Sequence, residues 1–213
     1  MAVSRQLAAN GNLAAEKLLE LHAPPTRITL ISHAVTVALK RASFPMDEPL
    51  TEGETEKIAS VGWAAPRAQH VWCGSERRTQ ETAKALGLEP AVSIDLGEVN
   101  YGTWQGREIG DIQANDPEGL ADWLTNVHAV PHGGESLAQL IARIRKWMEC
   151  QTNAGHVVAV THPAVIRAAI LSTMQAPLES FWRIEIAPLS VTDLRFNGKL
   201  WTVRSTGCSI RGS

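Results

Sequence analysis

Two apolar runs, each followed directly by a histidine, constrain the fold of this chain more than any other feature. Residues 27–32 and residues 156–161 consist mostly of aliphatic and β-branched side chains, and they lead into His33 and His162. Runs of this length and composition are typical of strands buried on both faces of a parallel sheet. Binding sites in such sheets lie at the carboxyl ends of the strands, so we expect both imidazoles at one site.

Strand and helix patterns alternate along the rest of the chain. Residues 97–119 are expected to be irregular, helices are predicted over residues 54–65, 76–87, 119–126, 137–147 and 163–174, and further strands over residues 69–73, 92–96, 183–187, 191–196 and 200–204. The last two strands are joined by Asn197-Gly198, a dipeptide typical of tight hairpins. This order predicts an α/β fold, namely a single-domain three-layer α/β/α sandwich with a mostly parallel central sheet and an antiparallel edge strand.

The size and composition suit one domain. The chain has 213 residues, of which 44% are hydrophobic and 20% charged, an ordinary balance for a globular domain with a substantial core. We expect this domain over residues 26–206, after a helical extension at residues 1–25 and before a tail at residues 207–213.

Charge and cysteine content exclude several classes of partner. A formal net charge of -2 offers no basic field for nucleic acid, so a small-molecule substrate is expected instead. Cys73, Cys150 and Cys208 are widely spaced, which argues against a disulfide framework or a zinc site and favours a reducing, cytoplasmic setting. The sequence lacks a run of about 18 apolar residues, so we expect no membrane partner.

Four chemically active side chains are predicted to meet at the carboxyl edge of the sheet. His33 and His162 end two strands, Arg78 opens the helix after the strand at residues 69–73, and Glu98 leads into a glycine-rich loop. Two imidazoles, a guanidinium and a carboxyl group, with no cysteine or serine elbow beside them, favour phosphoryl transfer through a histidine nucleophile.

Five separated segments resemble, in order and spacing, the pattern of the histidine phosphatase superfamily, also called the phosphoglycerate mutase-like family. That pattern has Arg-His-Gly near its start, then Ser-Pro-Leu-x-Arg with a downstream Thr-Ala, a Glu before Gly-x-x-x-Gly, then Gly-Gly-Glu-Ser, and finally Ser-His-Gly. The corresponding segments here are residues 32–34, 74–78 with 82–83, 98 with 102–106, 133–136 and 161–163. The resemblance extends from residue 27 to about residue 205 and implies the α/β fold described above.

The resemblance implies a phosphatase that acts on a small phosphorylated substrate without a metal or other cofactor. Unprotonated His33 would attack phosphorus and form a phosphohistidine. Arg78 and His162 would bind the phosphoryl oxygens, where charge accumulates in the transition state. Glu98, held protonated, would give its proton to the leaving alkoxide.

The sequence departs from the family pattern at the residue before the nucleophile. Ser32 stands where the family has arginine. Because an arginine that serves a transferring phosphoryl group is worth about 10³ to 10⁵ in rate, we expect reduced activity. Arg41, on the loop after His33, is the preferred candidate to supply the missing charge, with Arg77 and Arg167 as alternatives.

Three further side chains are of interest near the predicted site. Glu76 stands where the family usually has an apolar residue, and we expect it to complement the dipole of the helix that begins there. Thr36 could bind a phosphate oxygen or cap a loop, and Trp104, inside the glycine loop, is a candidate wall of the substrate cleft.

Three functions stay open at this point. The first is a phosphatase of reduced activity, and the second is a catalytically degenerate pseudo-phosphatase that binds an anion or a partner. The third is phosphotransfer of the phosphoglycerate mutase type. The sequence does not identify the substrate or the oligomeric state, for which a homodimer is one option.

Overall fold

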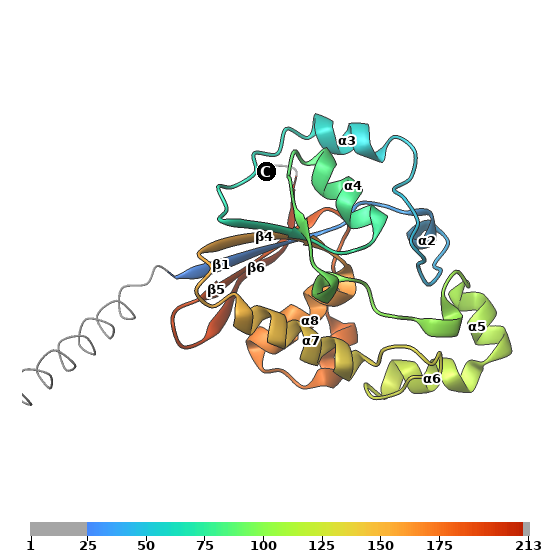
Figure 1. The fold of residues 1–213 in the computed structure, drawn as a ribbon. Helices are drawn as coiled ribbons and strands as arrows, with labels where there is room; N and C mark the ends of the chain where they lie inside the picture. Colours follow the sequence, from blue (N-terminus) through green and yellow to red (C-terminus); the bar gives the residue numbers. More distant parts are fainter. Residues whose placement is uncertain (1–24, 211–213) are drawn as a thin grey trace, which may run out of the picture.

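The computed structural model describes residues 25–210, which form one α/β domain (Figure 1). The helical extension predicted for residues 1–25 lies, apart from its last residue, outside the described residues. No helix in the described part of the chain is long and apolar enough to cross a membrane.

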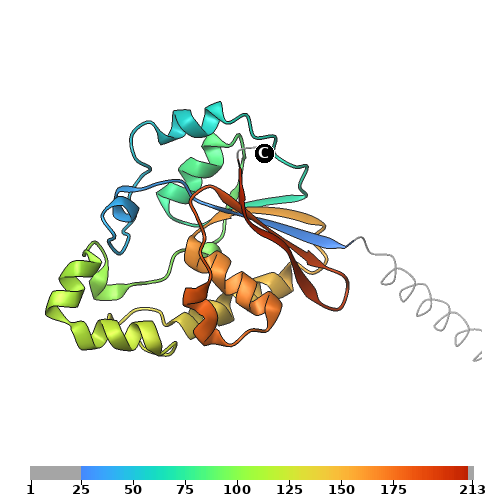
Figure 2. The same ribbon diagram turned by 180° about the vertical axis from the view of Figure 1, so that it is seen from behind.

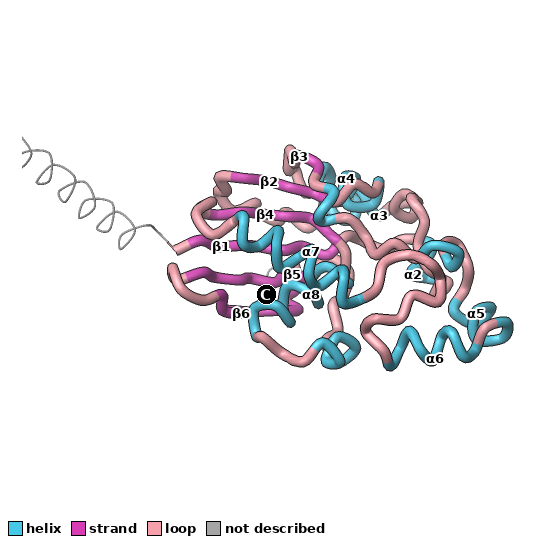
Figure 3. The backbone as a smooth tube through the Cα atoms, turned by 60° about the horizontal axis from the view of Figure 1, so that its bottom comes forward, coloured by secondary structure: helices cyan, strands magenta, loops and turns pink. Residues whose placement is uncertain are grey.

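Six strands form one sheet in the order β3-β2-β4-β1-β5-β6 (Figure 3). Their bounds are β1 (Thr26–Ser32), β2 (His70–Cys73), β3 (Ala91–Val92), β4 (His156–Thr161), β5 (Ser190–Phe196) and β6 (Trp201–Ser209). The pairs β3/β2, β2/β4 and β4/β1 are parallel, whereas β5 runs antiparallel to both β1 and β6. The predicted mostly parallel sheet with an antiparallel edge is confirmed.

The pairing of the two central strands positions the site. Ser32 of β1 lies opposite Thr161 of β4 in a parallel register, so the residues that follow them leave adjacent strands at the same level. The backbone N–H of His33 continues the ladder by donating to the Thr161 carbonyl at 2.9 Å. His33 and His162 therefore lie side by side, as expected for residues that follow two adjacent parallel strands.

Helices cover both faces of the sheet, which completes the predicted three layers (Figure 1). One face packs against α3 (Glu54–Ser60) and α4 (Arg77–Ala85), and the other against α7 (Leu137–Cys150) and α8 (Pro163–Met174). Successive residues of β4 serve the two cores in turn, since Val157 and Ala159 belong to one buried cluster and Val158 and Val160 to the other. This explains why the strand reads as an unbroken apolar run.

A third buried cluster lies beyond the carboxyl ends of the strands. The short helices α2 (Val37–Lys40), α5 (Ile109–Asn115) and α6 (Pro117–Thr125) stand off the sheet on this side (Figure 2). The cluster is mainly aromatic, with members contributed by the segment after α2, the loop before α5 and both α5 and α6: Phe44, Trp104, Ile112, Leu120 and Trp123.

The structure corrects four local predictions. Helix α5 lies within residues 97–119, where irregular chain is predicted, because Ile112 packs into the aromatic cluster and tertiary packing outweighs a weak pattern. The strand predicted at residues 92–96 is only two residues long and continues as a 3-10 turn, η1 (Ile94–Leu96). Strand β6 reaches Ser209, five residues past the end of the strand predicted at residues 200–204.

The fourth correction concerns residues 183–187, which form a loop after the 3-10 helix η3 (Leu178–Arg183) instead of a strand. Ile186 is buried, and the carbonyl of Ile184 accepts the Nε–H of Arg167 at 2.7 Å. The apolar alternation of this segment therefore belongs to a loop that covers the core. The Ile184 carbonyl bonds to the Arg167 side chain and not to a neighbouring strand.

Candidate active site

A cavity of about 150 Å³ opens at the carboxyl ends of β1 and β4. Five residues predicted for the site line it, namely Ser32, His33, Thr36, Arg78 and Glu98. The remainder of the wall is formed by Ala38, Leu39, Ser43, Pro45, Tyr101, Pro163, Ala164, Arg167, Ile186 and Pro188. The five predicted residues, which we call the floor of the cavity, are polar or charged. Most of the other lining residues are apolar.

His33 is buried at this floor as a neutral imidazole. Its Nδ1–H donates to the carbonyl of Ala34 at 2.7 Å, which leaves the lone pair on Nε2. The Ala34 N–H in turn donates to Thr82 Oγ1 at 3.0 Å, so α4 holds the turn after β1. Burial, together with the positive charges of His162 and Arg78, lowers the pKa of His33 from 6.5 to about 3. His33 is therefore unprotonated in the free protein, and its role as nucleophile stays a prediction.

The surroundings of His162 favour a positive charge, in contrast to the neutral His33. His162 is fully buried at the start of α8, where Pro163 occupies the first helical position. Its Nε2 lies 2.8 Å from Glu76 Oε2, and its Nδ1 lies 3.2 Å from Glu98 Oε2 in an ion pair without hydrogen-bond alignment. Burial alone would lower the pKa of His162, but the two carboxylates outweigh it and raise that pKa above its ordinary value. The two carboxylates therefore favour the imidazolium form of the ring.

Glu98 is an ionised carboxylate in the free site. Burial would raise its pKa, but the charges of His162 and Arg78 overcome this and hold the pKa well below its ordinary range. In the free protein Glu98 is therefore ionised. Its protonation beside a bound phosphate stays a prediction.

Arg78, the second residue of α4, is almost completely buried beneath the cavity. One terminal nitrogen donates to the carbonyl of Met46 at 2.6 Å, and the other lies 3.3 Å from Glu98 Oε2. Glu48 approaches at 3.8 Å. The Nε of Arg78 has no hydrogen-bond partner among the described residues. These contacts fix the guanidinium plane, so it faces an incoming anion without reorganisation.

Two hydroxyl groups complete the floor. Ser32 is fully buried at the end of β1, and its Oγ has no hydrogen-bond partner within residues 25–210. Thr36 caps α2, where its Oγ1 accepts the N–H of Leu39 at 3.3 Å. Both roles proposed for Thr36 are thus compatible with its position, since it caps a helix and also faces the cavity.

Two predicted binding residues lie elsewhere. Arg41 is exposed at the C-terminal end of α2 and does not line the cavity, because that helix turns residue 41 away from the strand end. Trp104 is 2% exposed and packs against Phe44 and Trp123 in the aromatic cluster. The wall position goes instead to Tyr101, three residues earlier, which contacts both the cavity and that cluster.

Arg167 is the additional cation that the structure brings to the cavity. It lies on α8, and its guanidinium carbon is 5.6 Å from the ring centre of Phe181 and 5.7 Å from that of Trp182. It lies five positions after His162, little more than one helical turn further along α8. This spacing could have favoured Arg167 over Arg41, whereas nothing in the sequence marks Tyr101.

Three of these side chains are close enough together to bind a metal ion in principle. Within the described residues, ligand atoms of His33, Glu98 and His162 lie within 4.8 Å of one another. A charged imidazolium offers no lone pair to a metal, and Arg78 adds positive charge to the floor. The arrangement therefore suits an anion better than a cation.

This constellation can be compared with known proteins. A family model described as the histidine phosphatase superfamily (branch 1) matches residues 14–209. The chain belongs to the histidine phosphatase superfamily. The family resemblance of the five sequence segments is confirmed.

Curated relatives include enzymes with named substrates. A glucosyl-3-phosphoglycerate phosphatase of Mycobacterium tuberculosis is 27% identical over 174 residues, covering 73% of this chain and 78% of that enzyme. A bifunctional protein of the same organism is 27% identical over 188 residues, covering 82% of this chain. The chain spans about half the length of this second relative, 52% of which is matched.

Solved structures of the superfamily share the fold. The alpha-ribazole phosphatase from Shigella flexneri superimposes with a TM-score of 0.76 at 23% identity, covering 88% of this chain and 98% of that one. At this level of identity the comparison supports the architecture and leaves the substrate open.

Proposed function

We propose that this protein is a phosphatase that hydrolyses a small phosphate monoester through a phosphohistidine on His33. The observation that carries the proposal is a contrast of charge at the cavity. His33, a neutral imidazole with a free Nε2, lines the cavity together with the cationic Arg78. His162 is fully buried behind this lining, with its ring 5.2 Å from that of His33, and its surroundings favour the positively charged form. A nucleophile that must attack an anion needs both an available lone pair and nearby charge to hold the phosphoryl oxygens.

In the first half-reaction, the lone pair on His33 Nε2 attacks phosphorus and the bond from phosphorus to the ester oxygen breaks. The N–P bond formed is a phosphohistidine, and its Nδ1–H stays on the Ala34 carbonyl. Arg78, Arg167 and the Nδ1–H of His162 supply donors to the phosphoryl oxygens as their charge grows. The cavity volume of about 150 Å³ suits a phosphate group and a few further atoms.

Glu98 manages the protons of both half-reactions. The negative charge of a bound phosphate disfavours the adjacent carboxylate form, so the complex takes up a proton from solvent on Glu98 while His162 stays charged. That proton passes to the leaving alkoxide, which departs as an alcohol. Glu98, again a carboxylate, then accepts a proton from the water that attacks phosphorus, and inorganic phosphate and free His33 are released.

We expect a slower reaction because Ser32 stands where the family pattern has arginine. Ser32 Oγ, which has no partner in the described structure, can donate one hydrogen bond to a phosphoryl oxygen but carries no charge. Arg167, which lines the cavity, would supply part of the missing charge. We expect Arg167→Met to weaken phosphate binding and Arg41→Met to leave it unchanged, because Arg41 is exposed outside the cavity.

A pseudo-phosphatase is the second candidate, and the charge balance favours it. Three cations at or beside the cavity, Arg78, Arg167 and His162, are matched by three carboxylates that contact two of them, Glu48, Glu76 and Glu98. A phosphate dianion therefore meets little net positive charge, which weakens binding and transition-state stabilisation alike.

Turnover of monoesters distinguishes the two candidates. We would incubate the protein with p-nitrophenyl phosphate and with the phosphate esters named for its relatives, an alpha-ribazole phosphate and a glucosyl phosphoglycerate, beside His33→Ala. The exposed His128 provides the matched control, His128→Ala. Turnover that is lost in His33→Ala only, with an acid-labile phosphoenzyme trapped in the wild type, supports the phosphatase. Phosphate binding without turnover or phosphoenzyme supports the pseudo-phosphatase and overturns the proposal.

A further inference from the structure

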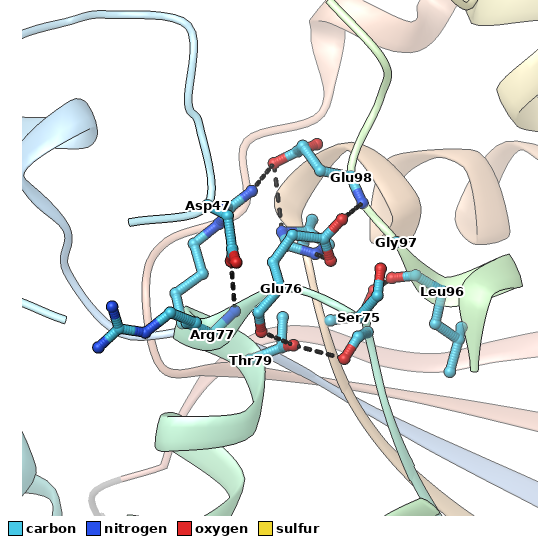
Figure 4. A network of polar contacts seen from close by, with 12 residues as sticks. Asp47, Ser75, Glu76, Arg77, Thr79, Leu96, Gly97 and Glu98 are labelled. Carbon is cyan, nitrogen blue, oxygen red and sulfur yellow. Dashed lines mark hydrogen bonds and ion pairs between the residues drawn. The ribbon is translucent and has the colours of Figure 1, made fainter. Parts of the chain in front are cut away.

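Glu76 lies behind His162, on the side away from the cavity. Its Oε2 contacts His162 Nε2 at 2.8 Å, and its Oε1 accepts the backbone N–H of Glu98 at 3.1 Å (Figure 4). One carboxylate thus holds both the imidazolium and the backbone of the residue proposed as the general acid. Glu76 is the N-cap residue of α4 and makes no side-chain hydrogen bond to the first turn of that helix. Its carboxylate still lies at the helix start, so the predicted complement to the helix dipole is compatible with these contacts.

Two glycines make room for this carboxylate. A Cβ atom at Gly74 would lie 3.1 Å from Glu76 Oε2 and 3.0 Å from His162 Nε2. A Cβ atom at Gly97 would lie 3.1 Å from Glu76 Oε1. All three distances are tighter than ordinary van der Waals contact, so a larger residue at either position would push against the carboxylate or the ring.

The glycine and the glutamate are departures from the family pattern in the same short segment. Where that pattern reads Ser-Pro-Leu, this chain has Gly74-Ser75-Glu76. A smaller residue at position 74 opens the space beside His162, and a longer acidic residue at position 76 fills it. The two replacements form one structural unit around the histidine.

We propose that Glu76 is a positioning residue: it holds the His162 ring with Nε2 turned away from the cavity, so that a charged Nδ1–H faces Glu98 and the bound phosphate. The inference rests on the proposed phosphatase function and adds a residue to it. An orienting carboxylate behind an imidazole fixes which nitrogen faces the substrate and stabilises the charged ring.

Several charged groups face His162, and they act in opposite directions. Glu76 and Glu98 favour its charged form, whereas Arg78 and burial oppose it. His33 lies nearby, with a ring-centre distance of 5.2 Å, but is neutral. Removing the charge of Glu76 leaves Glu98 as the remaining carboxylate contact in the described structure, so the pKa of His162 must fall and the ring must lose its proton at a lower pH.

The test replaces Glu76 with its neutral isostere. Glu76→Gln retains a polar group of the same size, so we expect a folded protein whose kcat/KM falls by about ten- to hundredfold, the range seen when orienting partners of histidine ligands are removed. The basic limb of the pH profile should move to lower pH. Glu81→Gln is the matched control, because Glu81 lies on the same helix but contacts Arg77 and the Leu50 N–H.

An NMR titration of the His162 side chain gives a readout that does not depend on turnover. In the free protein, Glu76→Gln should make His162 titrate at lower pH than wild type, and Glu81→Gln should not. If neither the titration nor the pH profile moves more in Glu76→Gln than in Glu81→Gln, the role of Glu76 is overturned while the phosphatase proposal stands. Absence of turnover in the wild type overturns the phosphatase proposal, and the titration still decides whether Glu76 holds the ring.

Discussion

The ends of β1 and β4 carry the same short pattern, a hydroxyl residue followed by histidine, yet the two histidines differ in charge. Ser32 and Thr161 are register partners on adjacent parallel strands, and both imidazoles are buried. His33 faces positive groups and a backbone carbonyl, whereas His162 lies between two carboxylates. The strand ends determine where the imidazoles stand, and residues from other segments determine what each can do.

The carboxylate that contacts His162 Nε2 is 86 residues away in the sequence. An apolar strand that ends in a histidine therefore predicts where the imidazole lies. Whether that imidazole is neutral or charged depends on contacts with residues far away in the sequence. The following substitutions each alter the end of β1 or the end of β4. They test whether His33 and His162 differ in charge and in their contribution to catalysis.

The largest effect is expected from restoring the arginine at the end of β1. Ser32→Arg places a fixed charge beside His33 and should raise kcat by about 10³, the lower end of what an arginine serving a phosphoryl group contributes. Ser32→Lys serves as the matched control and should gain less, since an ammonium cannot bind two phosphoryl oxygens in one plane. Steady-state kinetics measure both, and no gain in a folded Ser32→Arg protein would contradict this assignment of the β1 end.

Neutralising the end of β4 should have a somewhat smaller effect in the opposite direction. His162→Gln removes a preorganised charged donor and should lower kcat by about 10²-fold, in the range found for the loss of one oxyanion donor. Phosphoenzyme formation should slow, but the His33 adduct should still be detectable in rapid-quench experiments. An equal loss in His162→Gln and His33→Ala would mean that the two ends are not functionally distinct.

The pH dependence of stability should have opposite signs at the two ends. The pKa of folded His33 lies near 3, below its ordinary value of 6.5, so between these values the unfolded chain binds a proton that the folded chain does not, and stability falls as pH falls. The pKa of folded His162 is raised, so its contribution is complete below pH 6.5 and is lost as pH rises through the folded value. Each slope is at most one proton, or about 1.4 kcal/mol per pH unit.

Urea denaturation from pH 4 to pH 9 measures both slopes. Relative to wild type, His33→Asn should gain stability as the pH is lowered from 6.5 to 4. His162→Asn should be most destabilised below pH 6.5 and approach wild type at higher pH. Parallel curves for the two variants would show that the histidines share one charge state.

How much of this site could be predicted depends on which contacts carry each property. The sequence predicts the positions of four residues, because each follows or begins an element with a clear local pattern and parallel strands bring those ends together: His33, His162, Arg78 and Glu98. The sequence does not predict the charge of Glu98, because that charge depends on buried neighbours from β4 and α4 that outweigh its own desolvation.

The misplaced residues have equally physical reasons. Arg41 was assigned to the cavity because the segment after His33 read as a loop, but Thr36 caps a four-residue helix that carries Arg41 to the surface. Trp104 was assigned to the cleft because it lies in the glycine loop, whereas its ring is 5.1 Å from that of Phe44, which comes from a segment 60 residues earlier. Neither the short helix nor the aromatic contact leaves a periodic signal.

The smallest expected effect is on stability and compares the two hydroxyl residues themselves. Thr161 Oγ1 donates to the carbonyl of Leu96 at 2.7 Å, whereas Ser32 Oγ has no partner in the described structure. Thr161→Val should cost about 1–3 kcal/mol because it leaves that buried carbonyl unpaired, and Ser32→Ala should be neutral or stabilising. Chemical denaturation at one pH measures both, and equal losses would show that Ser32 Oγ is bonded in the folded protein.

The walls of the cavity come from segments near residues 32–45, 78, 98–101, 163–167 and 186–188, which span most of the described chain. No part of the unfolded polypeptide reproduces this arrangement, so a compound that binds there binds the native state alone. Its binding energy is added to the stability of the whole domain, about 2.7 kcal/mol at a concentration one hundred times its dissociation constant. A thermal-shift screen of phosphate esters would therefore rank ligands even if the chain never turns one over.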